Sequence, residues 1–455
     1  MKIRFAVMLA FAVTFLMVGC APTPIEDTAP LPTETEVAPA EAAVVDATGE
    51  TVIIADASRI LPIGGSVTEI VYALGAGDRV IARDDSSLYP RAVNDLDSVG
   101  YVRTLSAEPV LALEPTLIIT TEDAGPPEAV EQLRASGVTF LIVPTEESIE
   151  GVIEKITIIA TALEKETEGD ALIARLEADF AEAQTLLETV ETQPRVMFIY
   201  ARGAGAVSVA GTDTGAATMI EMAGGENAVT EFDGYQPITA EAVVAAAPDV
   251  ILMMTRGLES LGGVEGLLEQ PGIAATPAGE NRRVVVVDDL YLLGFSTRTA
   301  TATLDLTYLL HEELDPPLLT LLRTDGRFET LLTGIDAAGQ TALLSGEGPF
   351  TLFAPTDEAF DQLPPGTLDG LMSSTISLQA VLSYHLLDVA YTAGALMEQS
   401  GQPVQTLYPE GQLLVEAEDD SLMVNGSALV IESDRQAANG VLHIIDAVLL
   451  PERPQ

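Results

Sequence analysis

The sequence is short of three kinds of side chain: cysteine, histidine and the basic residues. Its 455 residues include 21 Lys and Arg against 69 Asp and Glu, a formal net charge of -48. Such an acidic surface repels nucleic acid and anionic lipid headgroups, so we expect neither as a partner. The single cysteine, Cys20, excludes an internal disulfide, and the folded part must depend on its hydrophobic cores. No histidine precedes His311, so most of the chain offers no imidazole to a metal ion.

The amino end has the features of an export signal. Lys2 and Arg4 precede an apolar run over residues 6–18, which is too short to span a bilayer. The run ends in Val18-Gly19-Cys20, which resembles a bacterial lipobox. We therefore expect a lipoprotein signal peptide at 1–20 and a lipid on Cys20. The protein would be exported and held on the outer face of the cell membrane, in the periplasm or at the cell surface, by that lipid alone. An ordinary signal peptide with an incidental cysteine is the alternative.

The next residues, 21–50, are rich in Pro, Thr, Glu and Ala and show no periodicity. This composition predicts a disordered tether that holds the folded part away from the membrane.

Residues 51–314 alternate short β-branched runs with helical stretches, which predicts α/β units with mostly parallel sheets. We expect strands at 80–81, 117–119, 140–143, 196–199, 250–252 and 284–287. An internal repeat relates residues 106–119 to 239–252: each copy has a capping hydroxyl, an early glutamate, an apolar helix, a proline and a buried strand. Two similar halves predict two lobes with a ligand cleft between them. Helices predicted at 148–163 and 170–190 join the halves and favour modest closure.

After Asp315-Pro316-Pro317 the βαβ rhythm stops, which marks a second domain. The predicted fold is therefore α/β, with two Rossmann-like lobes joined by a long helix, followed by a separate α+β domain at 318–451.

The first domain resembles the periplasmic hemin-binding proteins of ABC importers, within a two-lobed class that also carries cobalamin and siderophores. The resemblance covers essentially the whole domain. It depends on residues 64–77, on Ser87-Leu88-Tyr89-Pro90, and on the stretches 99–103 and 122–127. It implies heme as the transported ligand and a permease dimer with its ATPase as the partner.

In that family a tyrosine at the position of Tyr89 ligates the heme iron. Ferric iron is a hard cation and a phenolate is a hard anionic ligand, so the chemistry agrees with the resemblance. Some members add a histidine where this sequence has Arg202, so we expect five-coordinate iron through Tyr89 alone. Arg202 could instead pair with a propionate or stabilise the phenolate. The other candidates for the propionates are Arg83, Arg91, Arg103, Arg256 and Arg298.

Glu108 and Glu241 occupy matching places in the internal repeat. In similar proteins one glutamate on each lobe docks on arginines of the permease, and two repeat-related acidic side chains suit a two-fold dimer. A glutamate in the first turn of a helix also stabilises the helix dipole, which is the simpler explanation.

The second domain resembles a fasciclin-like domain. The match is strongest at residues 350–360, at 381–385 and at 439–451. We expect a Pro-Thr-Asp cap at 355–357 and Asn-Gly hairpin turns. The resemblance associates the domain with adhesion to an extracellular or cell-surface partner, and Tyr384-His385 match a pair linked to cell contact. Because His385 and His443 lie in apolar runs, core or semi-core histidines are the favoured interpretation of both.

No Ser-His-Asp, metal-ligand or phosphate-loop constellation is visible, so we expect a binding protein and not an enzyme. The leading hypothesis is a lipoprotein that captures hemin for an ABC importer and carries an adhesion module. The alternatives are a binder of cobalamin or a ferric siderophore, and a surface adhesin without a transport role.

Overall fold

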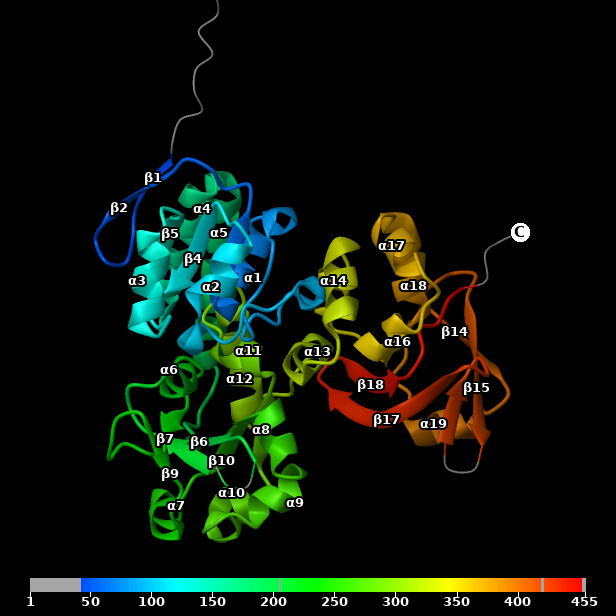
Figure 1. Ribbon diagram of the computed structural model, residues 1–455. Coiled ribbons are helices and arrows are strands. Elements are labelled where there is room, and N and C mark those ends of the chain that lie inside the picture. The colour runs from blue at the N-terminus through cyan, green and yellow to red at the C-terminus, as the bar shows by residue number, and fades with distance from the viewer. Residues whose placement is uncertain (1–41, 204, 206, 419–420, 452–455) are drawn as a thin grey trace, which may run out of the picture. The chain divides into compact units, whose positions relative to one another are not determined.

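The computed structural model describes residues 42–203, 205, 207–418 and 421–451 (Figure 1). The predicted signal peptide, Cys20 and most of the predicted tether lie outside these residues. The far end of the tether needs correction, because β1 (Ala42–Val45) pairs antiparallel with β2 (Thr51–Ile54). Asp46 closes this hairpin by accepting hydrogen bonds from the amides of Thr48 and Glu50. Over the part of the chain just defined, no helix is both long and apolar enough to cross a bilayer.

The first lobe is built on a parallel sheet with the strand order β3-β4-β5. Residues of β4 alternate between two hydrophobic cores, because helices cover both faces of the sheet. The run predicted at 80–81 forms no strand, and Val80 makes only one bridge, to Ile60. The strands are β3 (Ile60–Ile63), β4 (Leu117–Thr121) and β5 (Thr139–Val143), and the helices are α1 (Gly65–Ala73), α2 (Ala107–Ala112) and α3 (Pro127–Ala135).

Two helices join the lobes, close to where the sequence predicts them. α4 (Ile149–Ala162) begins after Ser148, whose hydroxyl accepts a hydrogen bond from the amide of Gly151. α5 (Glu166–Leu187) then lies against α4 and against α12 (Thr299–Leu310) of the second lobe. The long helix therefore contacts both halves of the domain.

The second lobe holds a mixed sheet in the order β11-β10-β6-β7-β9, with β8 also paired to β6. β6, β10 and β11 are parallel, and the predicted strands at 196–199, 250–252 and 284–287 are confirmed. The repeat is visible as α2 followed by β4 and α7 followed by β10. The strands are β6 (Arg195–Ala201), β7 (Val207–Ala210), β8 (Glu226–Asn227), β9 (Tyr235–Pro237), β10 (Val250–Met254) and β11 (Val284–Val287). The remaining helices are α6 (Gly215–Met222), α7 (Ala240–Ala246), α8 (Thr255–Ser260), α9 (Gly263–Leu268), α10 (Pro277–Glu280) and α11 (Asp289–Leu293).

The carboxyl-terminal domain has a sheet in the order β13-β12-β18-β17-β16-β15-β14, with helices packed on it. Thr356 caps α16 by accepting from the amide of Ala359, and Asn425-Gly426, both at positive φ, turn β16 into β17, as predicted. The helices are α13 (Leu318–Asp325), α14 (Glu329–Ala337), α15 (Thr341–Leu344), α16 (Asp357–Asp361), α17 (Thr367–Met372), α18 (Thr375–Tyr384) and α19 (Ala393–Glu398). The strands are β12 (Phe350–Pro355), β13 (Leu386–Leu387), β14 (Pro403–Gln405), β15 (Gln412–Glu418), β16 (Ser421–Val424), β17 (Ala428–Ala437) and β18 (Gly440–Ile445).

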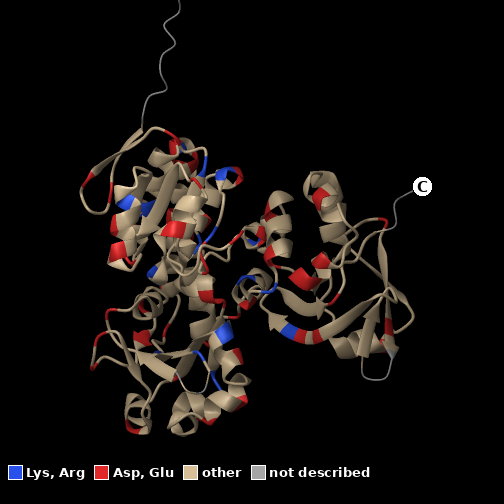
Figure 2. Cartoon of the chain, in the orientation of Figure 1, with Lys and Arg blue, Asp and Glu red and all other residues tan. Residues whose placement is uncertain are grey.

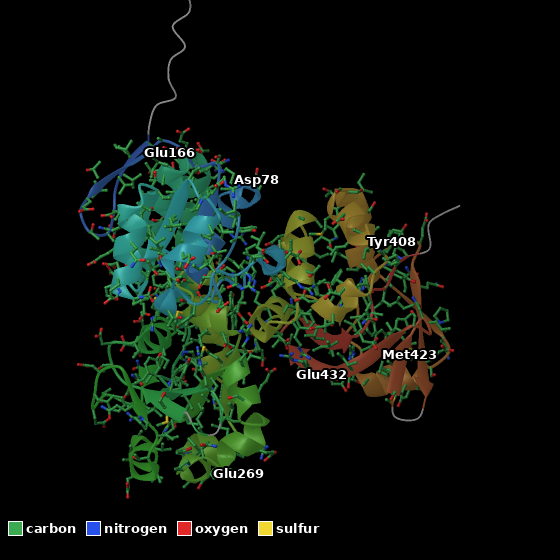
Figure 3. All side chains as sticks on the ribbon, in the orientation of Figure 1. Asp78, Glu166, Glu269, Tyr408, Met423 and Glu432 are labelled. Atoms are coloured by element: carbon green, nitrogen blue, oxygen red, sulfur yellow. The ribbon has the colours of Figure 1, made fainter. Side chains whose placement is uncertain are left out.

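The described residues from Ala42 onward belong to one compact unit, and a buried junction joins α12 to α13 within it. The carboxylate of Asp305, which is 1% exposed, accepts hydrogen bonds from Tyr291 Oη and Thr320 Oγ1, both at 2.6 Å. Arg323 lies 3.7 Å from the same carboxylate. A buried charge with this many partners fixes α13 against the second lobe. Figure 3 draws the side chains that fill the cores.

Candidate ligand site

The loop that carries Tyr89 is fastened to the first lobe by a buried carboxylate. Asp84 has no exposed surface and accepts hydrogen bonds from the amides of Gly64 and Ser86, both at 2.9 Å. Ser87 donates to the same carboxylate, and its hydroxyl lies 2.6 Å from that of Thr68 on α1. These bonds hold the segment before Tyr89 against the start of α1.

Tyr89 meets a cation from the other lobe. The guanidinium carbon of Arg298, the residue before α12, lies 3.5 Å from the centre of the Tyr89 ring. Arg298 also donates to the carboxylate of Glu69 on α1 at 2.7 Å, and Thr297 donates to it at 2.8 Å. Glu69 is 1% exposed, so this ion pair is sheltered from water. Nε of Arg298 is buried without a hydrogen-bond partner. The site is therefore built from both lobes.

The charged groups around Tyr89 shift the pKa of its phenol in opposite directions. Burial raises the pKa of the Tyr89 phenol to about 12; Arg298 acts to lower it, while Glu69, Glu329 and Asp336 act to raise it. Burial would also raise the pKa of Glu69, but the charge and the hydrogen bond of Arg298 outweigh it, and that pKa lies below its ordinary value. The phenol is thus protonated at neutral pH beside a permanently charged guanidinium.

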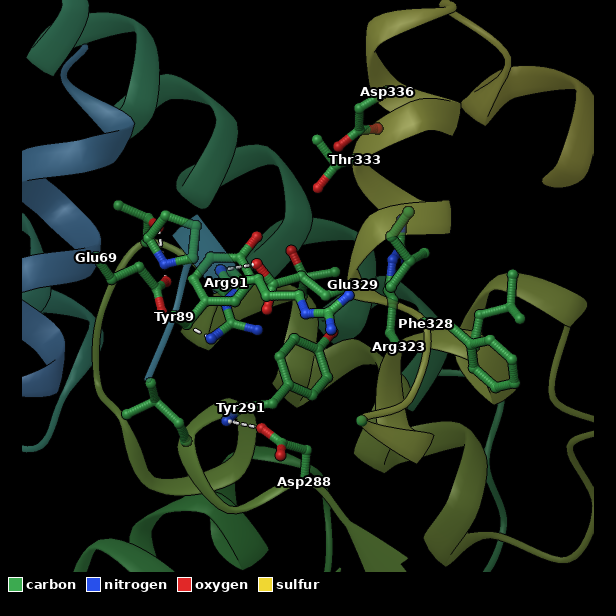
Figure 4. A pocket seen from close by; sticks show the side chains of 18 of the residues that line it. Glu69, Tyr89, Arg91, Asp288, Tyr291, Arg323, Phe328, Glu329, Thr333 and Asp336 are labelled. Atoms are coloured by element: carbon green, nitrogen blue, oxygen red, sulfur yellow. Dashed lines mark hydrogen bonds and ion pairs between the residues drawn. The ribbon is translucent and has the colours of Figure 1, made fainter. Parts of the chain in front are cut away.

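A cavity of about 600 Å³ opens beside Tyr89 (Figure 4). This volume lies within the range of small-molecule sites. Its lining combines apolar side chains such as Leu88, Leu172 and Leu290 with charged ones, and it draws residues from α1, α5, α11 and α12. Residues of α13 and α14 also line it, so the carboxyl-terminal domain forms part of its wall.

The structure divides the six candidate arginines into two sets. Arg91, Arg256 and Arg298 line the cavity with Tyr89. The other three are not among its lining residues: Arg83 donates to the carbonyl of Asp84, Arg103 pairs with Asp123 at 2.9 Å, and Arg202 lies 5.4 Å from the ring centre of Tyr200. Arg175 and Arg323 line the same cavity, which therefore has five arginines. Basic side chains are sparse over the whole ribbon, as Figure 2 shows, so this is a local concentration of positive charge.

Arg91 already has acidic partners from the carboxyl-terminal domain. Its amide donates to Glu329, and its guanidinium donates to Asp361 and, at 3.1 Å, to the carbonyl of Asp357. Burial raises the pKa of Glu329 to about 7, against the lowering effect of its bond with Arg91. On α5, Arg175 approaches Asp336 of α14 at 3.8 Å.

A second polar group lies between the lobes. Lys155 of α4 is 2% exposed, and its Nζ donates to the carbonyl of Phe295 at 3.1 Å and to Ser66 Oγ at 3.5 Å. Burial lowers its pKa to about 8, although Asp123 and Glu147 act to raise it. This ammonium connects α1, α4 and the loop before α12.

Glu108 and Glu241 are both exposed, in the first turns of α2 and α7. Thr239 caps α7 through its hydroxyl, whereas Ser106 makes no such side-chain bond at the start of α2. The equivalent positions of Glu108 and Glu241 in these two helices agree with the internal repeat.

Tyr384 and His385 are 7% and 1% exposed. His385 Nε2 accepts from the amide of Leu449, Nδ1 lies 2.8 Å from the carbonyl of Val381, and Tyr384 donates to the carbonyl of Gln412. Burial lowers the pKa of His385 to about 4. Both side chains therefore belong to the interior, as the core-histidine interpretation expected, and neither is placed to touch a cell surface.

Sequence reasoning missed the buried partners of the site. Glu69 stood in a recognised motif, but its pairing with Arg298 joins residues far apart in the chain. Asp305, Lys155 and the lining residues of α14 carried no local signal, because their role depends on how the elements pack.

Two family models match the chain. The model described as periplasmic binding protein matches residues 62–291, about half of the chain, and the fasciclin domain model matches residues 326–451. An uncharacterized ABC transporter substrate-binding lipoprotein, YvrC of Bacillus subtilis, is 27% identical over 63% of this chain and 91% of its own length.

One similar solved structure is the periplasmic heme-binding protein RhuT from Roseiflexus sp. RS-1, in apo form. It is 44% identical, covers 56% of this chain and 98% of its own, and has a TM-score of 0.55. A vitamin B12-binding protein of Vibrio campbellii is 25% identical over 45% of this chain and 74% of its own length.

Proposed function

Because this chain belongs to the periplasmic binding protein family and ends in a fasciclin domain, we propose that it captures hemin outside the cytoplasm for an ABC importer. The single observation that carries the proposal is the half-buried Tyr89 side chain beside a cavity of ligand size, with the guanidinium carbon of Arg298, from the other lobe, 3.5 Å from its ring centre.

Tyr89 is proposed as the ligand of the heme iron. A ferric centre favours an anionic oxygen donor, and its charge would displace the phenol proton. Arg298 supports the resulting phenolate from one face of the ring, since a guanidinium favours a neighbouring negative charge. The neutral phenol would persist only in the empty site.

Arg91 and Arg256 are proposed to receive the two propionates, because both line the cavity and a guanidinium binds a carboxylate strongly. Arg175 and Arg323 line it as well. Hemin is favoured over cobalamin by the higher identity to the heme-binding protein RhuT, and by a phenol donor at the cavity.

Delivery is proposed to use Glu108 and Glu241 as docking points for arginines of the permease dimer, whose ATPase drives transport. Their exposure on repeat-related helices supports this role. We also propose that a lipid on Cys20 anchors the exported protein. The fasciclin domain would contact a neighbouring surface component through side chains other than Tyr384 and His385.

A hemin titration of the purified protein tests the cargo. We expect an absorbance spectrum of tyrosinate-ligated heme in the parent protein, and its loss in Tyr89→Phe. Tyr72→Phe is the matched control, because Tyr72 is another tyrosine that lines the same cavity, whereas the ring that Arg298 approaches at 3.5 Å is that of Tyr89. Hemin capture through Tyr89 would be disproved by an unchanged spectrum in Tyr89→Phe, and hemin as cargo by no binding at all.

A further inference from the structure

The cavity beside Tyr89 has a wall that does not belong to the two lobes. α14 of the fasciclin domain contributes Glu329, Leu332, Thr333 and Asp336 to its lining. Figure 4 shows Thr333 and Asp336 pointing from α14 toward the side of the cavity that carries Tyr89. Glu329 also accepts a hydrogen bond from the amide of Arg91, two residues after Tyr89. The fasciclin domain therefore reaches the chemistry of the site.

This wall is fixed to the second lobe by buried contacts. Besides the bonds of Asp305 to Tyr291 and Thr320, the amide of Asp288 donates to the carbonyl of Thr324 at 3.0 Å. Leu318 and Leu322 of α13 have no exposed surface and pack in the same core as Phe328, the residue before α14. α13 thus contacts the second lobe and also packs in the core beneath α14.

On the side of the first lobe the wall is held by charges. Glu329, Asp357 and Asp361 surround Arg91, two residues after Tyr89, and Asp336 faces Arg175 at 3.8 Å. Side chains of Arg91 and Arg175 are 35% and 62% exposed, so each pair is individually weak and sensitive to salt. The wall is therefore held to the second lobe by buried contacts, and to Arg91 and Arg175 only by partly exposed ion pairs.

We infer that the hemin site is composite, with α14 of the fasciclin domain covering the ligand on the side away from the lobes. This inference rests on the proposed function. An enclosing wall limits the ligand to one of hemin's size and slows its dissociation, because the wall must lose its contacts with Arg91 before the ligand can leave.

Filling the cavity from α14 tests the inference in the full chain. Thr333→Phe places a ring at an exposed position of the wall, so the fold should survive. We expect hemin affinity to fall about tenfold or more, as overpacking predicts. Ala337→Phe is the matched control, since Ala337 is an exposed residue of α14 outside the cavity lining, and it should bind hemin like the parent. Equal affinity in both variants would overturn the composite site.

A second measurement does not require the fold to accept a phenylalanine at position 333. In a chain with Cys20→Ser, a fluorophore on Thr333→Cys should be quenched strongly by bound hemin, and one on Ser427→Cys, in the β16–β17 turn, should be quenched far less. Equal quenching at the two positions would reject the composite site. If the Tyr89-dependent spectrum were present at the same time, hemin capture would still stand; if the parent protein bound no hemin, the proposed function itself would be lost.

Discussion

The guanidinium of Arg298 lies against the ring of Tyr89 while it pairs with the carboxylate of Glu69. The three residues come from α1, from the loop after Val80 and from the start of α12, so the contact exists only when both lobes are in place. It places a fixed cation against the Tyr89 ring, and it gives a buried carboxylate its counter-charge. Binding chemistry and stability are therefore coupled at Arg298.

Replacing Arg298 should cost stability as well as affinity. Arg298→Leu leaves Glu69 buried and unpaired, which should lower the free energy of unfolding by about 3–5 kcal/mol. Arg256→Leu is the control, because Arg256 is exposed and should change stability by less than about 0.5 kcal/mol. Urea denaturation measures both, and equal midpoints would show that the Glu69–Arg298 pair does not support the fold.

Hemin binding should release a proton from Tyr89. The phenol has a pKa of about 12 in the empty site, so at pH 7 it must lose its proton to ligate iron. Calorimetric titration in buffers of different ionisation enthalpy measures the release. We expect it in the parent protein and expect it to be smaller in Tyr89→Phe; identical proton release in the two would contradict phenolate ligation.

The junction between the domains should depend on Asp305. Asp305→Ala removes the acceptor of two buried hydroxyls and leaves Arg323 without its partner, so we expect a loss of about 3 kcal/mol or more. Thr324→Val is the matched control on α13, because its hydroxyl bonds only the carbonyl of Thr320. Differential scanning calorimetry should also show the two domains unfolding separately in Asp305→Ala. A single unchanged transition would refute the role of the junction.

The fasciclin domain should lose stability in acid. His385 has a folded pKa of about 4 against an ordinary value of 6.5, so the unfolded chain binds more protons between these values. Its stability contribution is therefore complete above pH 6.5 and is lost as the pH falls to about 4, on the order of 3 kcal/mol. Urea midpoints at pH 7 and 4.5 measure this, and His385→Gln should flatten the dependence. An equally steep dependence in His385→Gln would assign the effect to other groups.

Transport should require Glu108 and Glu241, and hemin binding should not. Glu108→Ala with Glu241→Ala should leave the hemin spectrum intact and abolish uptake in cells that carry the permease and ATPase. Glu128→Ala is the control, because Glu128 is an exposed glutamate in the first turn of α3 but lies outside the repeat. Normal uptake by the double variant would remove both glutamates from docking.

Much of the architecture was predictable because its signals are local. The strands at 117–119 and 250–252, the helices at 148–163 and 170–190 and the Asn425-Gly426 turn follow from periodicity, caps and turn chemistry, which act over a few residues. The prediction of a strand at 80–81 was wrong. A short apolar run forms a strand only where it can pair along its length, and Val80 makes a single β-bridge with Ile60. The predicted tether at 21–50 also extends too far, since β1 pairs with β2 within it.

The sequence by itself determined the two domains, the repeat and the strongly negative net charge, because each depends on composition or on contiguous residues. The choice of Tyr89 as iron ligand depends on the family resemblance and stays a prediction. Only the tertiary structure decided that Arg91, Arg256 and Arg298 share the cavity with Tyr89, while Arg83, Arg103 and Arg202 do not. It also decided that Asp305 holds the domains together and that α14 forms a wall of the site. These relationships join residues distant in the chain, and their energies come from burial and charge pairing, which exist only once the elements have packed.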